Sequence, residues 1–171
     1  MRPGFLSALL VAGAAVLDAL AGNVLSVHGV KPSFAVIAVY AFSITAGETS
    51  GIFYGALGGL MVDCLSGGYP GLFMSEYAII GYFAGKAGRK WFNVGESANF
   101  GGIFGLSALG ALYAAALIGT LSGTAGTLWL MMRFGLPGAL YNAVVGACLL
   151  WLFKKQLARR VPWLRYIQVR L

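Results

Sequence analysis

Apolar stretches, separated by short groups of charged and turn residues, fill almost the whole chain and limit the folds that it can adopt. The 171 residues are 59% hydrophobic and only 10% charged, against about 25% charged in an ordinary soluble domain. A soluble core could not bury this much apolar sequence, and no long stretch has the strand-like alternation of an outer-membrane barrel. The sequence therefore predicts an all-α polytopic membrane protein.

Six stretches have the composition of transmembrane helices, with predicted bounds 5–27, 32–46, 51–65, 69–85, 98–121 and 136–153. The second and third are short for a bilayer, which needs about 17 to 25 residues, and only 47–50 separates them. We expect these two to form a tight hairpin whose ends lie inside the protein. The segment 122–133 is rich in small residues; it either extends the fifth helix or rests at the outer interface with Trp129 as an anchor.

Basic residues are divided unequally between the two sides of this arrangement. With six spans both termini share one side, and of the 12 basic residues only Lys31 and Arg133 fall on the other. The positive-inside rule then places both termini in the cytoplasm. The alternative is a signal peptide cleaved after Ala19-Leu20-Ala21, which would leave five spans and an external N-terminus. The apolar run continues past that point, which favours a retained first helix.

The chain divides into a membrane domain, 1–153, and a basic juxtamembrane tail, 154–171. Each basic residue near an anionic lipid surface contributes about 1 kcal/mol of attraction. The tail is either an orientation signal lying on the lipid or a docking site for a cytoplasmic partner. Nucleic acid is not expected as a ligand of so short a tail against the membrane. The candidate lipid contacts are Lys154, Lys155, Arg159 and Arg160.

One apolar stretch carries a row of glycines that ends in a carboxylate. Gly51, Gly55 and Gly59 recur every four residues, and Asp63 falls on the same face of a helix. An ionised Asp in a bilayer costs roughly 2.5 to 3.5 kcal/mol, so it should face protein or water. The glycines permit close approach of another helix, either within the bundle or from a partner protein.

Two further acids, Asp18 and Glu76, fall with Asp63 in the outer half of the membrane when each residue contributes about 1.5 Å of helix. We predict that the three form a polar cluster that faces outward and binds a partner or lines a cavity, with Arg133 and Lys31 as the available counter-charges. The alternative is that each acid caps a backbone or bonds a nearby serine. A proton relay is not favoured, since broken-helix repeats are missing.

No enzyme site can be assembled from the sequence. It contains no pairing of nucleophile and base, no P-loop and no dinucleotide fingerprint. His28 is the one histidine, in a predicted loop, and it cannot form a zinc site with two distant cysteines. Cys64 and Cys148 lie in apolar runs and are predicted to be free, buried thiols. We expect no enzyme activity, no metal and no cofactor.

A series of short segments forms a recognisable pattern: Lys31-Pro32-Ser33-Phe34, Tyr40, Gly51-x3-Gly55-x2-Gly58-Gly59-x3-Asp63-x2-Ser66-Gly67-x3-Gly71-Leu72, Ile80-Gly81-Tyr82 and, later in the chain, Leu136-Pro-Gly-Ala-Leu-Tyr-Asn142. On these segments the chain resembles, over 31–85, the MreD family of rod shape-determining proteins. Asp63 with Gly55, Gly59, Gly67 and Gly71 matches the family motif, whereas Asp18 and Glu76 lie outside it.

This resemblance implies a non-enzymatic component of the bacterial inner membrane that acts in cell elongation. It implies a bitopic MreC-like partner and, through it, MreB filaments, RodA and the elongation transpeptidase that build lateral peptidoglycan. The expected role is a scaffold whose outward polar patch and glycine-lined groove engage the MreC-like helix. The layout is also similar to the six-helix substrate-binding subunits of energy-coupling-factor transporters. The alternative function is therefore a membrane subunit that binds a small molecule or lipid near Asp63.

Overall fold

The computed structural model describes residues 3–21, 26, 29–67, 69–94, 96–122, 129 and 131–160, with side chains over 5–20, 26, 29–67, 69–88, 98–121, 129 and 132–152. Every secondary-structure element longer than one residue in this part is a helix, which confirms the all-α prediction. The α-helices are α1 (Pro3–Ala21), α2 (Phe34–Ala46), α3 (Glu48–Ser66), α4 (Leu72–Val94), α5 (Glu96–Ser122) and α7 (Leu136–Arg160), and a π-helix, η1 (Met131–Gly135), precedes α7.

Each predicted apolar stretch corresponds to one α-helix, because each is an uninterrupted run of helix-compatible residues between turn signals. Within the described residues, two stretches are long and apolar enough to cross a membrane, Ala98–Leu121 and Met132–Leu152. Phe5–Leu20 and Phe34–Ala46 are apolar but shorter. Helix α7 continues beyond the predicted limit at residue 153 to Arg160. The number of membrane crossings stays a prediction.

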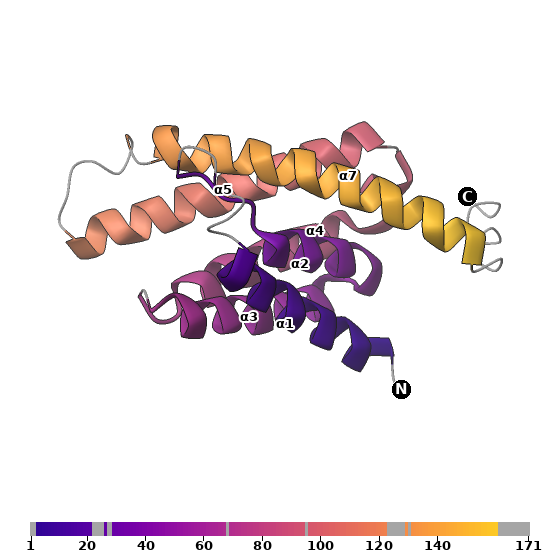
Figure 1. The fold of residues 1–171 in the computed structure, drawn as a ribbon, viewed down its shortest axis with the longest axis horizontal. Coiled ribbons are helices and arrows are strands. Elements are labelled where there is room, and N and C mark those ends of the chain that lie inside the picture. The colour runs from indigo at the N-terminus through magenta and orange to yellow at the C-terminus, as the bar shows by residue number, and fades with distance from the viewer. Residues whose placement is uncertain are drawn as a thin grey trace.

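The helices form two layers, which Figure 1 shows with α5 and α7 side by side along one face of the molecule. Helices α1 to α4 pack on one another, and α5 and α7 pack against α4 and α2. A buried cluster joins the layers through residues of α2, α4, α5 and α7: Tyr40, Ile44, Ala84, Ile103, Ala143 and Leu150. The start of α1 and the end of α7 lie at the same end of the molecule (Figure 1).

The connection between α2 and α3 is shorter than the sequence suggests. Only Gly47 separates the two helices, and it has a φ of 91° that L side chains rarely adopt. Glu48, Thr49 and Ser50 belong to the first turn of α3, so the predicted four-residue connection is wrong. The expected burial of the hairpin ends is also wrong, since Thr45, Glu48 and Thr49 are exposed.

The predicted glycine row is the contact surface between α3 and α4. A Cβ atom at Gly55 would lie 2.5 Å from the carbonyl carbon of Tyr77, and one at Gly59 would lie 2.5 Å from the Cα of Met74. A Cβ at Gly51 would lie 2.8 Å from the carbonyl carbon of Gly81. Because the two backbones touch, α4 of the same chain fills the row. The expectation of a glycine-lined groove open to a partner helix is therefore wrong for this face.

Candidate functional site

Asp18, near the end of α1, lies against the start of α2. Its carboxylate accepts hydrogen bonds from the Phe34 amide (2.5 Å), the Ala35 amide (3.1 Å) and the Ser33 hydroxyl (2.9 Å). The first N–H groups of a helix have no partner within the helix, and a negative charge there is further stabilised by the helix dipole. Asp18 therefore caps α2 from the preceding helix.

Asp63 does the same for the next pair of helices. Its carboxylate accepts hydrogen bonds from the amides of Gly71, Phe73 and Met74, each at 3.0 Å, at the start of α4. Two successive helix pairs thus share one arrangement, in which an Asp near the end of the first helix caps the second. The capping alternative describes both acids. We call the end of the bundle that holds these two caps the acid end.

Ser33 is the junction of a hydrogen-bond network at the acid end. Its amide donates to Asn142 Oδ1 of α7 (2.7 Å), and its hydroxyl lies 3.0 Å from the Tyr77 hydroxyl of α4. The Asn142 amide nitrogen in turn lies 3.5 Å from the Ser107 hydroxyl of α5. Together with Asp18, the network connects α1, α2, α4, α5 and α7.

Sequence reasoning did not select Asn142, Tyr77 or Ser107 as site residues. A signal for Asn142 was present, because it ends the second segment that carries the MreD resemblance, while Ser33 lies in the first segment. The structure brings these two segments together through the Ser33–Asn142 hydrogen bond. Tyr77 and Ser107 carry no comparable signal, since a Tyr or Ser within an apolar helix is common.

Glu76 is placed differently from the two capping acids. It is the fifth residue of α4, is only 8% exposed and faces α5, where a Cβ at Gly110 would be 2.6 Å from Glu76 Oε1. The structure shows no hydrogen bond to its carboxylate within the described part of the chain. The adjacent Ser75 does bridge the seam, since it accepts a hydrogen bond from the Tyr113 hydroxyl of α5 (3.0 Å).

Neither predicted counter-charge forms an ion pair with an acid in the described residues, although Lys31 is near enough to Asp18 for their charges to attract. The Arg133 guanidinium lies over the rings of Trp129 and Phe134, 4.8 Å and 5.5 Å from their centroids, an arrangement that satisfies it by cation–π attraction. Lys31 is exposed, and no ion pair joins either cation to an acid in the described residues. Backbone N–H groups take the place that these cations were expected to fill for Asp18 and Asp63.

The remaining predicted residues divide into three groups. Cys64 and Cys148 are free, as predicted, but both are exposed, because they lie on the outer faces of α3 and α7. Lys154, Lys155, Arg159 and Arg160 belong to α7, but their side chains lie outside the described residues, as does His28. The described residues contain no group of three His, Cys, Asp or Glu side chains that could hold a metal ion.

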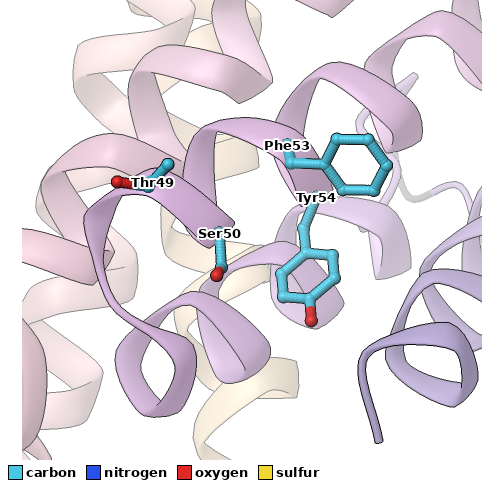
Figure 2. Close-up of a pocket in the computed structure, with 4 residues that line it drawn as sticks. All are labelled: Thr49, Ser50, Phe53 and Tyr54. Carbon is cyan, nitrogen blue, oxygen red and sulfur yellow. The ribbon is translucent and has the colours of Figure 1, made fainter. Parts of the chain in front are cut away.

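A pocket of about 300 Å³ lies at the other end of α3 from Asp63 and is lined by Thr49, Ser50, Phe53 and Tyr54 (Figure 2). Figure 2 shows the Ser50 and Tyr54 hydroxyls directed to the same side of α3. With about 1.5 Å of rise per residue, Tyr54 is roughly 13 Å along the helix from Asp63. The pocket is therefore separate from the capping acids.

Comparison with known proteins identifies the family. The protein-family model described as rod shape-determining protein MreD matches residues 3–161, which is nearly the whole chain and extends well beyond the segments that carry the resemblance in the sequence. Neither curated proteins nor solved structures yielded a match. Coverage of this extent, together with the all-helical fold and its apolar helices, shows that the chain belongs to the MreD family of rod shape-determining proteins.

Proposed function

We propose that the protein is a non-enzymatic scaffold of the bacterial inner membrane that holds an MreC-like bitopic protein within the cell-elongation complex and so helps to direct lateral peptidoglycan synthesis. The family match over residues 3–161 carries this proposal, because the family acts in rod shape determination. The geometry of the acids supports it. Asp18 and Asp63 are committed to backbone N–H groups, which is a structural use of a carboxylate.

In the proposed topology the chain crosses the membrane six times, with both termini in the cytoplasm and the acid end facing outward. The distribution of basic residues supports this orientation. The shared location of the start of α1 and the end of α7 is consistent with an even number of crossings. Arg133 and the exposed Trp129 then lie on the outer side, where aromatic residues commonly anchor a protein at the membrane interface.

Two surfaces are suited to a bitopic partner. On α5, Gly101 and Gly105 are exposed, and a Cβ at either position would meet no atom within 4 Å. This spacing allows a single transmembrane helix to approach closely, in the way that α4 approaches the glycine row of α3. At the outer end, Arg133 with Trp129 and Phe134 forms an exposed group of the residue types that dominate protein interfaces. This group would contact the juxtamembrane segment of the partner.

Affinity purification from native membranes in mild detergent, with mass spectrometry of the proteins that stay attached, tests the proposal. We expect recovery of an MreC-like protein, and a several-fold smaller recovery with Gly105→Leu or Arg133→Ala. Gly13→Leu is the matched control, because Gly13 of α1 is also exposed with nothing within 4 Å of its Cβ position. Equal recovery from all three variants would rule out these surfaces. Recovery of a paired ATPase module in place of the elongation proteins would favour the transporter alternative.

A further inference from the structure

The three acids within the helical bundle divide into two kinds. Asp18 and Asp63 are half-buried, and each accepts three hydrogen bonds, at least two of them from the first turn of a helix. Glu76 is more deeply buried, with 8% of its surface exposed, and the described residues donate no hydrogen bond to it. The acid with the least contact with solvent is therefore also the one without donors.

The groups around Glu76 offer no compensation for a negative charge. Asp63 is near enough to interact with it unfavourably, and Tyr77, beside it on α4, is bound to Ser33. On the facing helix, Gly110 presents only backbone, and the Tyr113 hydroxyl donates to Ser75. Neither nearby basic residue balances Glu76: Lys31 is exposed and its charge acts on Asp18, and Arg133 is stacked on aromatic rings.

A carboxylate without a cation or donors is very costly in a low-dielectric environment, and such a group binds a proton and becomes neutral. A neutral carboxyl group is a hydrogen-bond donor and can be packed against an apolar helix at far lower cost. Glu76 is surrounded on α4 by Leu72, Phe73, Ile79 and Ile80 and is pressed against the glycine backbone of α5. These surroundings accommodate the neutral carboxyl group of Glu76 and not its carboxylate.

We propose that Glu76 is a proton-binding site at the seam between α4 and α5, occupied at neutral pH, whose proton allows the two helix layers to stay in contact. The ligand is a single hydrogen ion. The site is not a step in a proton relay, because backbone amides hold the carboxylates of Asp18 and Asp63 in their caps. Loss of the proton would place a charge beside Asp63 and against the Gly110 backbone, and the seam would have to open to hydrate it.

Infrared difference spectroscopy on the purified chain at neutral pH tests the proposal. A protonated carboxyl has a carbonyl stretching band that an ionised carboxylate lacks. We expect such a band in the wild-type protein, its loss in Glu76→Gln, and its retention in Asp18→Asn, Asp63→Asn and the exposed control Glu48→Gln. Absence of the band from the wild type, or its persistence in Glu76→Gln, would overturn the assignment.

A second measurement covers the case in which Glu76→Gln does not fold, and it uses the wild-type chain. A hydrophobic carbodiimide takes the proton of a neutral acid onto nitrogen, and the carboxylate oxygen then bonds to its central carbon. The O-acylurea rearranges to a stable adduct that peptide mass spectrometry can locate. We expect the adduct on Glu76 and not on Asp18 or Asp63. Labelling of the aspartates in place of Glu76, or of no bundle acid, would refute the proposal.

Discussion

The same substitution, Gly→Ala, should have opposite effects at Gly55 and at Gly105. At Gly55 the new methyl carbon would lie 2.5 Å from the Tyr77 carbonyl carbon and 2.7 Å from the Ala78 nitrogen, whereas ordinary contacts between such atoms are about 3.5 to 4.0 Å. These are backbone atoms of a helix, so they cannot rotate away. Relief of the clash requires α3 and α4 to separate by about 1 Å along the whole glycine row, which weakens the contacts at Gly51 and Gly59 as well.

The magnitude follows from two terms. Overpacking of a well-packed contact costs about 1 to 3 kcal/mol. Replacement of Gly by Ala in a helix interior stabilises the helix by about 1 kcal/mol. Gly105→Ala gains the second term without the first, because nothing lies within 4 Å of its Cβ position. We therefore expect Gly105→Ala to be neutral or stabilising, and Gly55→Ala to be less stable than Gly105→Ala by about 1 to 3 kcal/mol.

Reversible unfolding of the purified protein in mixed detergent and SDS micelles, followed by circular dichroism, measures this difference. The helix-propensity term is common to both variants, so their comparison isolates the packing term. Gly101→Ala serves as a second control on the open face of α5. Equal stability of Gly55→Ala and Gly105→Ala would refute the close packing of α3 on α4, and with it the assignment of the glycine row to that contact.

Three further predictions follow from the acid end and the tail. Asp63→Ala leaves three amides at the start of α4 without their acceptor and should destabilise the protein by about 0.5 to 2 kcal/mol in the same unfolding assay, with Asp63→Asn losing less; no change would contradict the cap. Two double-mutant cycles, one pairing Asn142→Ala and the other Asn142→Asp with Tyr77→Phe, should each show a coupling of about 0.5 to 3 kcal/mol, since both side chains contact Ser33. Strict additivity would count against the network. Conversion of four basic tail residues to Gln should weaken binding of the C-terminal peptide to anionic vesicles by about 1 kcal/mol per residue: Lys154, Lys155, Arg159 and Arg160. Neutral vesicles are the control, and equal binding would mean that these charges do not contact lipid.

The sequence predicts the helices well because the information for them is local. Each apolar run persists until a turn signal ends it, and the structure places a helix in each run. The position of Asp63 on the face of Gly51, Gly55 and Gly59 is also local, since it follows from the helical repeat. Which helix packs against that face does not follow from the local sequence. The glycines permit close approach, but the sequence does not state which helix approaches, and the structure shows it to be α4.

The candidate site shows the same division. That the acids face protein follows from the cost of exposing them to lipid. Their partners could not be read from the sequence, since Asp18 bonds amides on the helix that follows and the Ser33 amide reaches Asn142, 109 residues further along the chain. The expectation that Arg133 would pair with an acid failed because aromatic rings beside it, on Trp129 and Phe134, provide a nearer partner.

The Ser33–Asn142 hydrogen bond also orders events during biosynthesis. A ribosome makes Ser33 early and Asn142 late, so the amide at the start of α2 has no acceptor from α7 until most of the chain has been translated. Asp18, by contrast, precedes α2 and can cap it as soon as that helix forms. The first helix pair therefore has its Asp18 cap as soon as both helices are made, and it gains the Ser33–Asn142 hydrogen bond only once α7 has been made. A chain truncated before α7 should retain the Asp18 cap and leave the Ser33 amide accessible to hydrogen exchange, and protection of that amide in the truncated chain would contradict this order.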